Sequence, residues 1–325
     1  MDDEPLSPAE VRSLTNVVNR IAGGVASAVL GKPEVVRLAV TAVLAEGHLL
    51  VEDVPGVGKT TLARALSTVV GGVWRRIQCT PDLLPSDITG VTVYRQADAA
   101  FEFRPGPVFA NVVLADELNR ASPKTQSALL EVMEERQVTV DGVRYPVPAP
   151  FLVVATQNPV EAAGTYPLPE AQLDRFLMKL SVGYPDEDAE VDVVRNASAG
   201  RSPDDLPPVA DPERLRAVVA LAARAHVADA LYRYAVRLAA ATRTHPAVRV
   251  GASPRGAVAL ARAARAYACT AGRGYVVPED LQDLLEPVLA HRLVLAPESY
   301  LQGVTPRDVL RDVVWAVPVP APVAA

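Results

Sequence analysis

Residues 49–63 read LLVEDVPGVGKTTLA, and the rest of the chain can be arranged around them. The apolar run Leu49–Val51 predicts a buried strand, Gly56 and Gly58 allow a loop to turn its N–H groups inward, and Thr60 begins a predicted helix. A strand, a glycine-containing loop and a helix in this order are typical of a phosphate-binding loop, because loop N–H groups and a helix N-terminus both attract phosphate oxygens.

The side chains of this loop fit a nucleotide bound with Mg²⁺. Lys59 is expected to reach the β- and γ-phosphates, and the Thr60 hydroxyl to take one coordination position on Mg²⁺. The usual pattern G-x-x-x-x-G-K-[ST] has glycine where this chain has Asp53, so the motif is imperfect and a plain glycine-rich turn is the alternative. The predicted nucleotide-binding residues of the loop are Pro55, Gly56, Val57, Gly58, Lys59, Thr60 and Thr61.

Composition narrows the class of protein. The 325 residues suit one large or two modest domains, and 50% hydrophobic with 22% charged residues is typical of a globular core. The net charge of −6 means that the chain has no overall excess of basic residues of the kind that binds nucleic acid. Cys79 and Cys269 lack disulfide or zinc-ligand spacing, which favours a reducing compartment. There is no secretory signal and no uninterrupted apolar stretch of roughly 20 residues, so we expect no membrane span and a cytoplasmic location.

A second chemical stretch, NVVLADE, occupies residues 111–117. Apolar residues followed by two carboxylates predict a buried parallel strand that presents acids at its carboxyl end, where α/β sheets place their sites. Asp116 is expected to hold the metal through water, and Glu117 to polarise the attacking water as general base. In isolation the same pair would also suit a helix start, but it follows a phosphate-binding loop here.

Three further polar residues are candidates for the site. The predicted strand at 151–156 leads to Asn158, which could orient the water or contact the γ-phosphate; its alternative is a turn-forming Asn-Pro. Arg175 lies on a short predicted helix and could be a surface ion pair. Arg255 lies in the first turn of a helix capped by Ser253, where a solvated arginine is the alternative.

The order of elements predicts an α/β fold. Four strands with intervening helices give a three-layer αβα arrangement around a parallel sheet. Hairpins are expected at about Val91–Phe103, with its tip at Gln96–Ala100, and at Gln137–Val147, with Asp141-Gly142 at the tip. After Tyr184-Pro185 only helices are predicted. Further helices and strands are predicted at 7–30, 33–45, 62–70, 73–79, 119–135, 177–182, 213–225, 229–243, 254–271 and 278–290, with loops at 160–169 and 197–212 and a poorly ordered tail at 317–325.

Taken together, the motifs resemble those of the AAA+ ATPases and, within them, the MoxR family, over about residues 29–293. The pieces that carry the resemblance are EDVPGVGKT (52–60), DLLPSD (82–87), FRPGP (103–107), ADELNRA (115–121), EERQV (134–138), ATQNP (155–159), LDRF (173–176) and SPR (253–255). Acidic residues at position 53 look tolerated in this family. The resemblance implies an αβα nucleotide-binding domain at 1–183, an all-helical lid domain at 184–325 and a ring, usually of six subunits.

The resemblance also implies roles for the polar candidates. Asn158 matches the first sensor, and Arg255 matches the second sensor, which contacts the γ-phosphate from the lid. Arg175 matches the arginine finger that a neighbouring subunit inserts in trans, and Arg120 is a weaker candidate for an inter-subunit contact. The two hairpins resemble insertions that mark this branch of AAA+ proteins and would contact a client.

The expected function is Mg²⁺-dependent ATP hydrolysis that drives chaperone-like remodelling or maturation of protein complexes or metalloenzymes. MoxR-like proteins typically act with a partner that carries a von Willebrand factor A (VWA) domain. One alternative is the motor subunit of a metal chelatase. A nucleic-acid translocase needs basic hairpin tips, and the hairpin at 137–147 offers only Arg144 against Asp141. A nucleotide-sensing scaffold without turnover is disfavoured by the intact Asp116-Glu117 pair.

Overall fold

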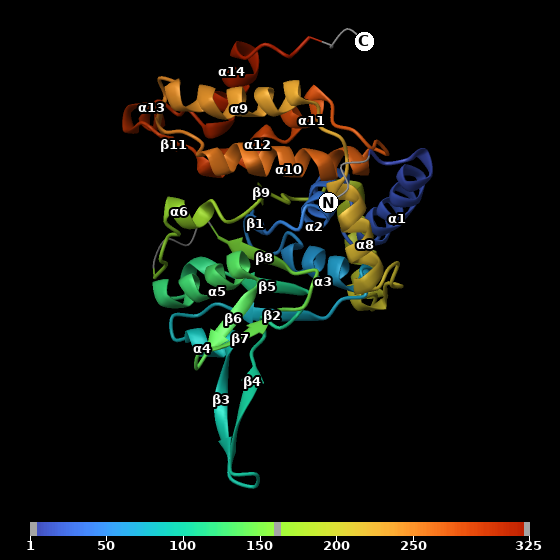
Figure 1. Ribbon diagram of the computed structural model, residues 1–325, viewed down its shortest axis with the longest axis vertical. Coiled ribbons are helices and arrows are strands. Elements are labelled where there is room, and N and C mark those ends of the chain that lie inside the picture. The colour runs from blue at the N-terminus through green and yellow to red at the C-terminus, as the bar shows by residue number, and fades with distance from the viewer. Residues whose placement is uncertain (1–4, 159–163, 322–325) are drawn as a thin grey trace.

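A parallel sheet lies at the centre of the computed structural model, which describes residues 5–158 and 164–321 (Figure 1). Its strands are β1 (Leu49–Glu52), β2 (Trp74–Gln78), β5 (Val112–Asp116), β8 (Leu152–Gln157) and β9 (Met178–Leu180). They lie in the order β2-β5-β8-β1-β9. The sheet has five strands, one more than the four counted for the layered arrangement; the fifth is the strand predicted at 177–182, present as β9, which pairs with β1 with Met178 opposite Leu49.

Helices cover both faces of this sheet, as the predicted three layers require. On one face lie α1 (Pro8–Ala26), α2 (Pro33–Leu44) and α3 (Lys59–Val69), and on the other lie α4 (Pro85–Thr89) and α5 (Pro123–Glu135). Successive side chains of a strand point to opposite faces. Val112 and Leu114 accordingly pack with the α1–α3 layer, whereas Val113 and Ala115 pack with the α4–α5 layer. Burial on both faces explains why β5 and β8 read as nearly unbroken apolar runs.

Both predicted hairpins are present. The first joins β3 (Gly90–Arg95) to β4 (Ala100–Pro105) and projects away from the body of the protein (Figure 1). The second joins β6 (Gln137–Val140) to β7 (Val143–Pro146). Its tip residues Asp141 and Gly142 have φ angles of 51° and 80°, the left-handed conformation that a two-residue hairpin turn needs. The ring of Phe103 stacks on that of Tyr145 with centroids 4.0 Å apart, so the two hairpins are in contact.

The chain beyond Tyr184 is mainly helical, as predicted. It contains α7 (Glu187–Ser198), α8 (Pro212–Ala223), α9 (Asp229–Thr244), α10 (Pro254–Thr270), α11 (Pro278–Asp283), α12 (Leu285–Leu289), α13 (Pro297–Leu301) and α14 (Pro306–Ala316). The predicted helix at 278–290 is divided at Leu284. This part also contains a short antiparallel ladder that the sequence reading did not predict, between β10 (Val248–Val250) and β11 (Val294–Leu295).

Several short elements complete the chain. They are α6 (Glu170–Leu173) and the 3₁₀ turns η1 (Leu118–Arg120), η2 (Pro203–Asp205) and η3 (Ala290–Arg292). Residues 159–163 of the predicted Asn-Pro turn and loop, and residues 322–325 of the predicted tail, lie outside the described ranges. Within those ranges, none of the helices has the length and apolarity needed to cross a bilayer.

A buried arginine joins the helical part of the chain to the segment that leads into β9. Arg292 of η3 is 4% exposed, and its guanidinium donates to the Asp174 carboxylate at 2.7 Å and to the Phe176 carbonyl at 2.7 Å. Asp174 itself is only 16% exposed. Removing one partner of such a pair leaves the other charge buried and uncompensated.

We therefore expect Arg292→Met to lower the free energy of unfolding by roughly 3–5 kcal/mol. The matched control is Arg307→Met, because Arg307 is 78% exposed and pairs only at the surface with Glu286. That control should cost at most about 1 kcal/mol. Urea denaturation of the two variants measures the difference, and equal losses would contradict a bridging role for Arg292.

Candidate functional site

The predicted site residues of three strands meet at one edge of the sheet. The loop at 53–58 follows β1, Asp116 ends β5, and Asn158 follows β8. Register supports this placement, because Glu52 lies opposite Gln157 and Gln78 lies opposite Asp116. We call this the loop edge. The carboxyl ends of parallel strands share one edge, which is why residues so far apart in sequence come together.

The loop has the backbone form of a phosphate cradle. Gly56 and Gly58 have φ angles of +86° and +94°, and a Cβ at either would meet nothing within 4 Å, so glycine is there for its backbone conformation. Helix α3 begins at Lys59, and the first N–H groups of a helix have no partner within it. The Lys59 ammonium donates to the Asp53 carbonyl at 2.7 Å, which holds it beside the loop. The residues present therefore fit a polyphosphate.

Asp53, the departure from the usual motif, has a role of its own. Its Oδ2 accepts hydrogen bonds from Ser181 Oγ at 2.9 Å and from the N–H groups of Val182 at 2.8 Å and Gly183 at 2.7 Å. Burial acts to raise the pKa of Asp53, but these bonds, together with one from the Val54 N–H, outweigh it and lower the pKa below its ordinary 3.8. The carboxylate thus fastens the start of the loop to the end of β9.

Asp53→Ala is expected to lower the free energy of unfolding by about 1–3 kcal/mol at pH 7, because it leaves backbone N–H groups without an acceptor. A lowered folded pKa means that the ionised carboxylate stabilises the fold above the ordinary pKa, and that this contribution disappears as pH falls through the folded value. The difference in free energy of unfolding between Asp53→Ala and the wild type should therefore shrink below about pH 4. Urea unfolding at pH 7 and pH 3 measures it. The control Asp98→Asn, at the exposed hairpin tip, should change little at either pH.

Asp116 and Glu117 are held by hydrogen bonds from the two strands next to β5, β2 and β8, and from η1. The Thr156 hydroxyl of β8 donates to Asp116 Oδ1 at 2.6 Å and accepts the Glu117 N–H at 2.8 Å, so it positions both acids. Glu117 has a φ of +55°, uncommon for a residue with a side chain, and its Oε2 accepts from Arg120 at 2.9 Å and Gln78 at 3.2 Å. These bonds fix the orientation of the Glu117 carboxylate.

Thr156, Gln78 and Arg76 were not among the predicted site residues. Arg76 donates to Asp116 Oδ2 at 2.6 Å. Thr156 is a polar residue in an otherwise apolar strand, which is the signal that could have identified it, whereas β2 reads WRRIQ and gives Arg76 and Gln78 no such signal. A cation that approaches Asp116 meets the Arg76 guanidinium, so a contact through water, as predicted, suits Asp116 better than direct ligation.

The acids present also bear on the predicted magnesium site. In the part of the chain that the structure describes, no three His, Cys, Asp or Glu side chains lie together as a metal-binding group. Mg²⁺ bound with phosphates needs only one or two protein ligands, preferably oxygen. The Thr60 hydroxyl at the start of α3 and the Asp116 carboxylate fit that limited role.

Arg175 and Arg255 do not reach the loop edge of their own chain. Arg175 precedes β9 and its Nε lies 3.1 Å from Glu134 Oε2, while Arg255 Nη2 lies 3.5 Å from Glu134 Oε1. The Leu177 N–H, two residues after Arg175, donates to the His48 carbonyl just before β1. Both arginines therefore lie at the opposite edge of the sheet, which we call the arginine edge, and strands of this length separate the edges by roughly 15–20 Å.

Arg255 lies on the arginine edge of its own chain and not beside the loop, because α10 begins over that edge, where Ser253 Oγ also donates to Asp174 at 3.2 Å. Its contact with a γ-phosphate stays a prediction. Arg120, the weaker candidate for an inter-subunit contact, pairs with Glu117 of its own chain at 2.9 Å. Asn158 is buried at the loop edge.

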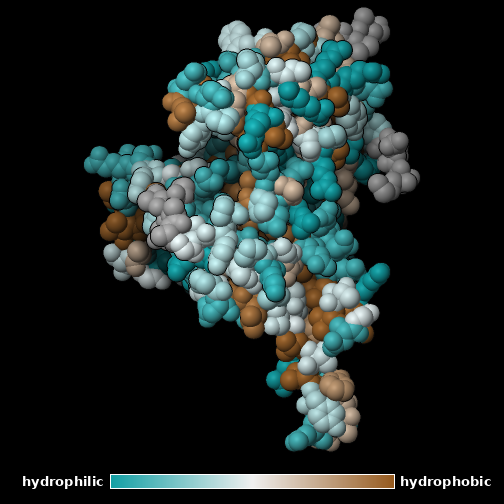
Figure 2. Space-filling model, turned by 90° about the vertical axis from the view of Figure 1, so that its left-hand side faces the viewer, coloured by the Kyte–Doolittle hydropathy of each residue, from teal (hydrophilic) through white to brown (hydrophobic). Residues whose placement is uncertain are grey.

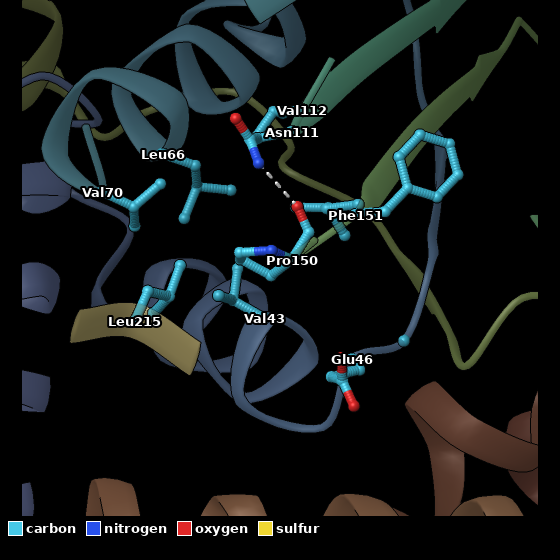
Figure 3. A pocket seen from close by; sticks show the side chains of 11 residues that line it. Val43, Glu46, Leu66, Val70, Asn111, Val112, Pro150, Phe151 and Leu215 are labelled. Atoms are coloured by element: carbon cyan, nitrogen blue, oxygen red, sulfur yellow. Dashed lines mark hydrogen bonds between the residues drawn. The ribbon is translucent and has the colours of Figure 1, made fainter. Parts of the chain in front are cut away.

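A small cavity of about 20 Å³ lies away from the loop, near the beginnings of β5 and β8 (Figure 3). Its lining is mainly apolar, with the Asn111 amide donating to the Pro150 carbonyl at 3.0 Å. It contains none of the predicted site residues and is too small for a nucleotide.

Comparison with known proteins agrees with this architecture. A family model described as "ATPase family associated with various cellular activities (AAA)" matches residues 48–178, and one described as "AAA lid domain" matches residues 240–313. A crystal structure of a candidate ATPase from Cytophaga hutchinsonii superposes with a TM-score of 0.90 at 36% identity, covering 96% of this chain and 98% of that one.

Relatives with curated names extend over nearly the whole chain. It is 50% identical over 291 residues to the uncharacterized protein YeaC of Bacillus subtilis, covering 90% of this chain and 91% of the relative. It is 43% identical over 301 residues to Chaperone MoxR1 of Mycobacterium tuberculosis, covering 90% of this chain and 79% of the relative. It is 36% identical over 322 residues to Protein MoxR of Methylorubrum extorquens, covering 91% of this chain and 93% of the relative. With its parallel sheet, phosphate-binding loop and helical lid, the chain belongs to the MoxR family of AAA+ ATPases.

Proposed function

We propose that this protein is a Mg²⁺-dependent ATPase that acts as a ring of identical subunits, six by resemblance to its family, and remodels a client protein. The observation that carries the proposal is the separation of the loop edge from the arginine edge. A head-to-tail contact between copies brings the arginine edge of one subunit to the loop edge of the next, and repetition of that contact closes a ring. Each nucleotide is then enclosed by two subunits.

Each site residue has a defined part in this mechanism. The loop amides and Lys59 bind the phosphates, and Mg²⁺, held through Thr60 and Asp116, neutralises phosphate charge when it is bound. Glu117 accepts a proton from the attacking water, and Asn158 orients that water. Arg175 and Arg255 of the adjacent subunit stabilise the charge that develops on the transferred phosphoryl group.

Movement of the helical part transmits hydrolysis to a client in this proposal. We place the boundary between the nucleotide-binding domain and the lid after Gly183, with domains at 1–183 and 184–325. The client is contacted by the projecting hairpin of β3 and β4, where Phe101 is 75% and Tyr94 is 54% exposed. Figure 2 shows hydrophobic surface along this projection. Exposed aromatic side chains on a projection support contact with another protein.

The partner and the place of action follow from resemblance and composition. One relative, named Chaperone MoxR1, supports remodelling, and a VWA-domain protein is the proposed partner in maturing a protein complex or metalloenzyme. The cytoplasm is the proposed location, supported by two buried cysteines that remain free thiols. A pull-down with a Glu117→Gln variant in ATP, which holds the bound state, should recover a VWA-domain protein; recovery without one would remove that partner.

The ATPase rate measured against protein concentration, with and without Mg²⁺ and with assembly size followed in parallel, tests the ring. Specific activity should rise as copies assemble and should require Mg²⁺. A rate per chain that is the same for monomers and assemblies would overturn the shared site and leave a monomeric P-loop switch.

A further inference from the structure

A second cavity, of about 250 Å³, lies on the helical side of the protein and away from the loop edge. It is formed where the end of α2 and the residue after α5 meet α8 and α10. Its lining contains three arginines and one acid; the charged residues are Glu46, Arg136, Arg262 and Arg265. The rest of the lining is apolar and comprises Leu44, Ala45, Val219, Ala222, Ala223 and Ala266.

The three guanidinium groups of this cavity are held by neutral acceptors. Arg136 Nη1 donates to the Phe151 carbonyl at 3.1 Å, Arg262 Nε to the Ala45 carbonyl at 2.6 Å, and Arg265 Nη2 to the Tyr232 hydroxyl. Among residues 5–158 and 164–321, none of the three has a carboxylate oxygen within 4.0 Å. The cavity therefore carries an excess of positive charge that the described chain does not neutralise.

Other partly buried arginines of the helical part are paired with acids. Arg273 meets Asp280 at 2.5 Å and Arg292 meets Asp174 at 2.7 Å. Arg265 differs further, because its Nε is buried and makes no hydrogen bond in the described structure. A buried donor without an acceptor costs free energy, so the Arg265 guanidinium is not fully satisfied by the described chain.

We infer that this cavity binds a small metabolite that carries a phosphate group. Guanidinium groups match phosphate oxygens in charge and planar geometry, and three arginines line this cavity. The apolar lining accommodates the uncharged body of the ligand, and a volume of about 250 Å³ exceeds what a phosphate ion alone would fill. The site shares no residue with the loop, with Arg175 or with Arg255, so it is separate from the nucleotide site.

The cavity joins parts of the chain that the proposed mechanism moves. Glu46 and Arg136 belong to the sheet domain, whereas Arg262 and Arg265 belong to α10 of the lid. A ligand that touches both sides is sensitive to their relative position, which gives it a means of altering ATP hydrolysis. This regulatory consequence rests on the proposed function, but binding itself does not, so the two are tested separately.

Isothermal titration with inorganic pyrophosphate and with glucose 6-phosphate against glucose, at constant ionic strength, tests the site. The full chain carries Lys59→Ala throughout, so that phosphate binding by the loop is weakened, and the Arg265→Ala comparison reports on the cavity. We expect both phosphates to bind and glucose not to bind, and Arg265→Ala to weaken binding at least about tenfold. The matched control Arg237→Ala removes an exposed arginine of α9 outside the cavity and should leave binding unchanged.

Three outcomes would overturn the inference. The first is that neither phosphate binds to the Lys59→Ala chain, and the second is that the Arg265→Ala and Arg237→Ala variants bind the phosphates equally. The third is that added phosphate changes the assembly size and does not bind in the cavity. The last would show that acidic side chains of another copy fill the cavity. Arg262→Gln provides a second variant with the same expected loss, should Arg265→Ala alter the unfolding midpoint.

Discussion

Replacing Glu117 by glutamine is expected to lower the rate of ATP hydrolysis by roughly 10²–10⁴-fold while ATP binding is retained. Glutamine has nearly the same shape and can still accept the hydrogen bond that Arg120 donates to Glu117 Oε2 at 2.9 Å. An amide cannot accept a proton from water, so only the chemical step is lost. The loop residues that bind phosphate are untouched.

Steady-state hydrolysis and equilibrium binding of a fluorescent ATP analogue measure the two effects separately. The matched control is Glu131→Gln, which makes the same chemical change at an exposed position on α5. It should hydrolyse ATP at the wild-type rate. If Glu117→Gln kept the full rate, or lost binding together with hydrolysis, Glu117 would not be the general base.

Replacing Arg175 by alanine is expected to lower hydrolysis in the assembled protein by roughly 10³-fold or more, because an arginine supplied in trans stabilises the charge of phosphoryl transfer. The residual rate of dilute, unassembled protein should not change. Arg249→Ala is the control: Arg249 is 60% exposed and its ion pair with Glu170 is long, at 3.7 Å. It should retain nearly all activity.

Mixing two inactive variants gives a sharper test of the trans contribution. Lys59→Ala copies keep the arginine edge, and Arg175→Ala copies keep the loop edge. If copies mix freely in equal amounts, about a quarter of head-to-tail contacts join an intact loop to an intact arginine, and activity should return. Arg255→Ala should behave like Arg175→Ala in this assay. Failure of both mixtures with Lys59→Ala to recover activity would mean that these arginines act within their own chain or only on folding.

Much of the fold could be predicted because its signals are local. The apolar runs that end in acids or in a glycine-containing loop identified β5 and β1, and Asp141-Gly142 identified a hairpin tip through its turn preference. The helix α7 was missed because of its 12 residues only Ala189 is buried, so it carries no clear apolar stripe. The division of α11 from α12 at Leu284 likewise leaves no break in the apolar pattern.

The sequence by itself determined a glycine-containing loop between a strand and a helix, a pair of acids at a strand end and a helical C-terminal part, because glycine, charge and hydrophobic period act over a few neighbouring residues. Only the tertiary structure decided what these groups touch. Asp53 bonds to residues 128–130 positions later, Thr156 positions acids 40 and 39 positions earlier, and Arg255 meets Glu134 at the edge opposite the loop. These contacts depend on the strand order β2-β5-β8-β1-β9, which is set by packing of the whole chain and not by any local pattern.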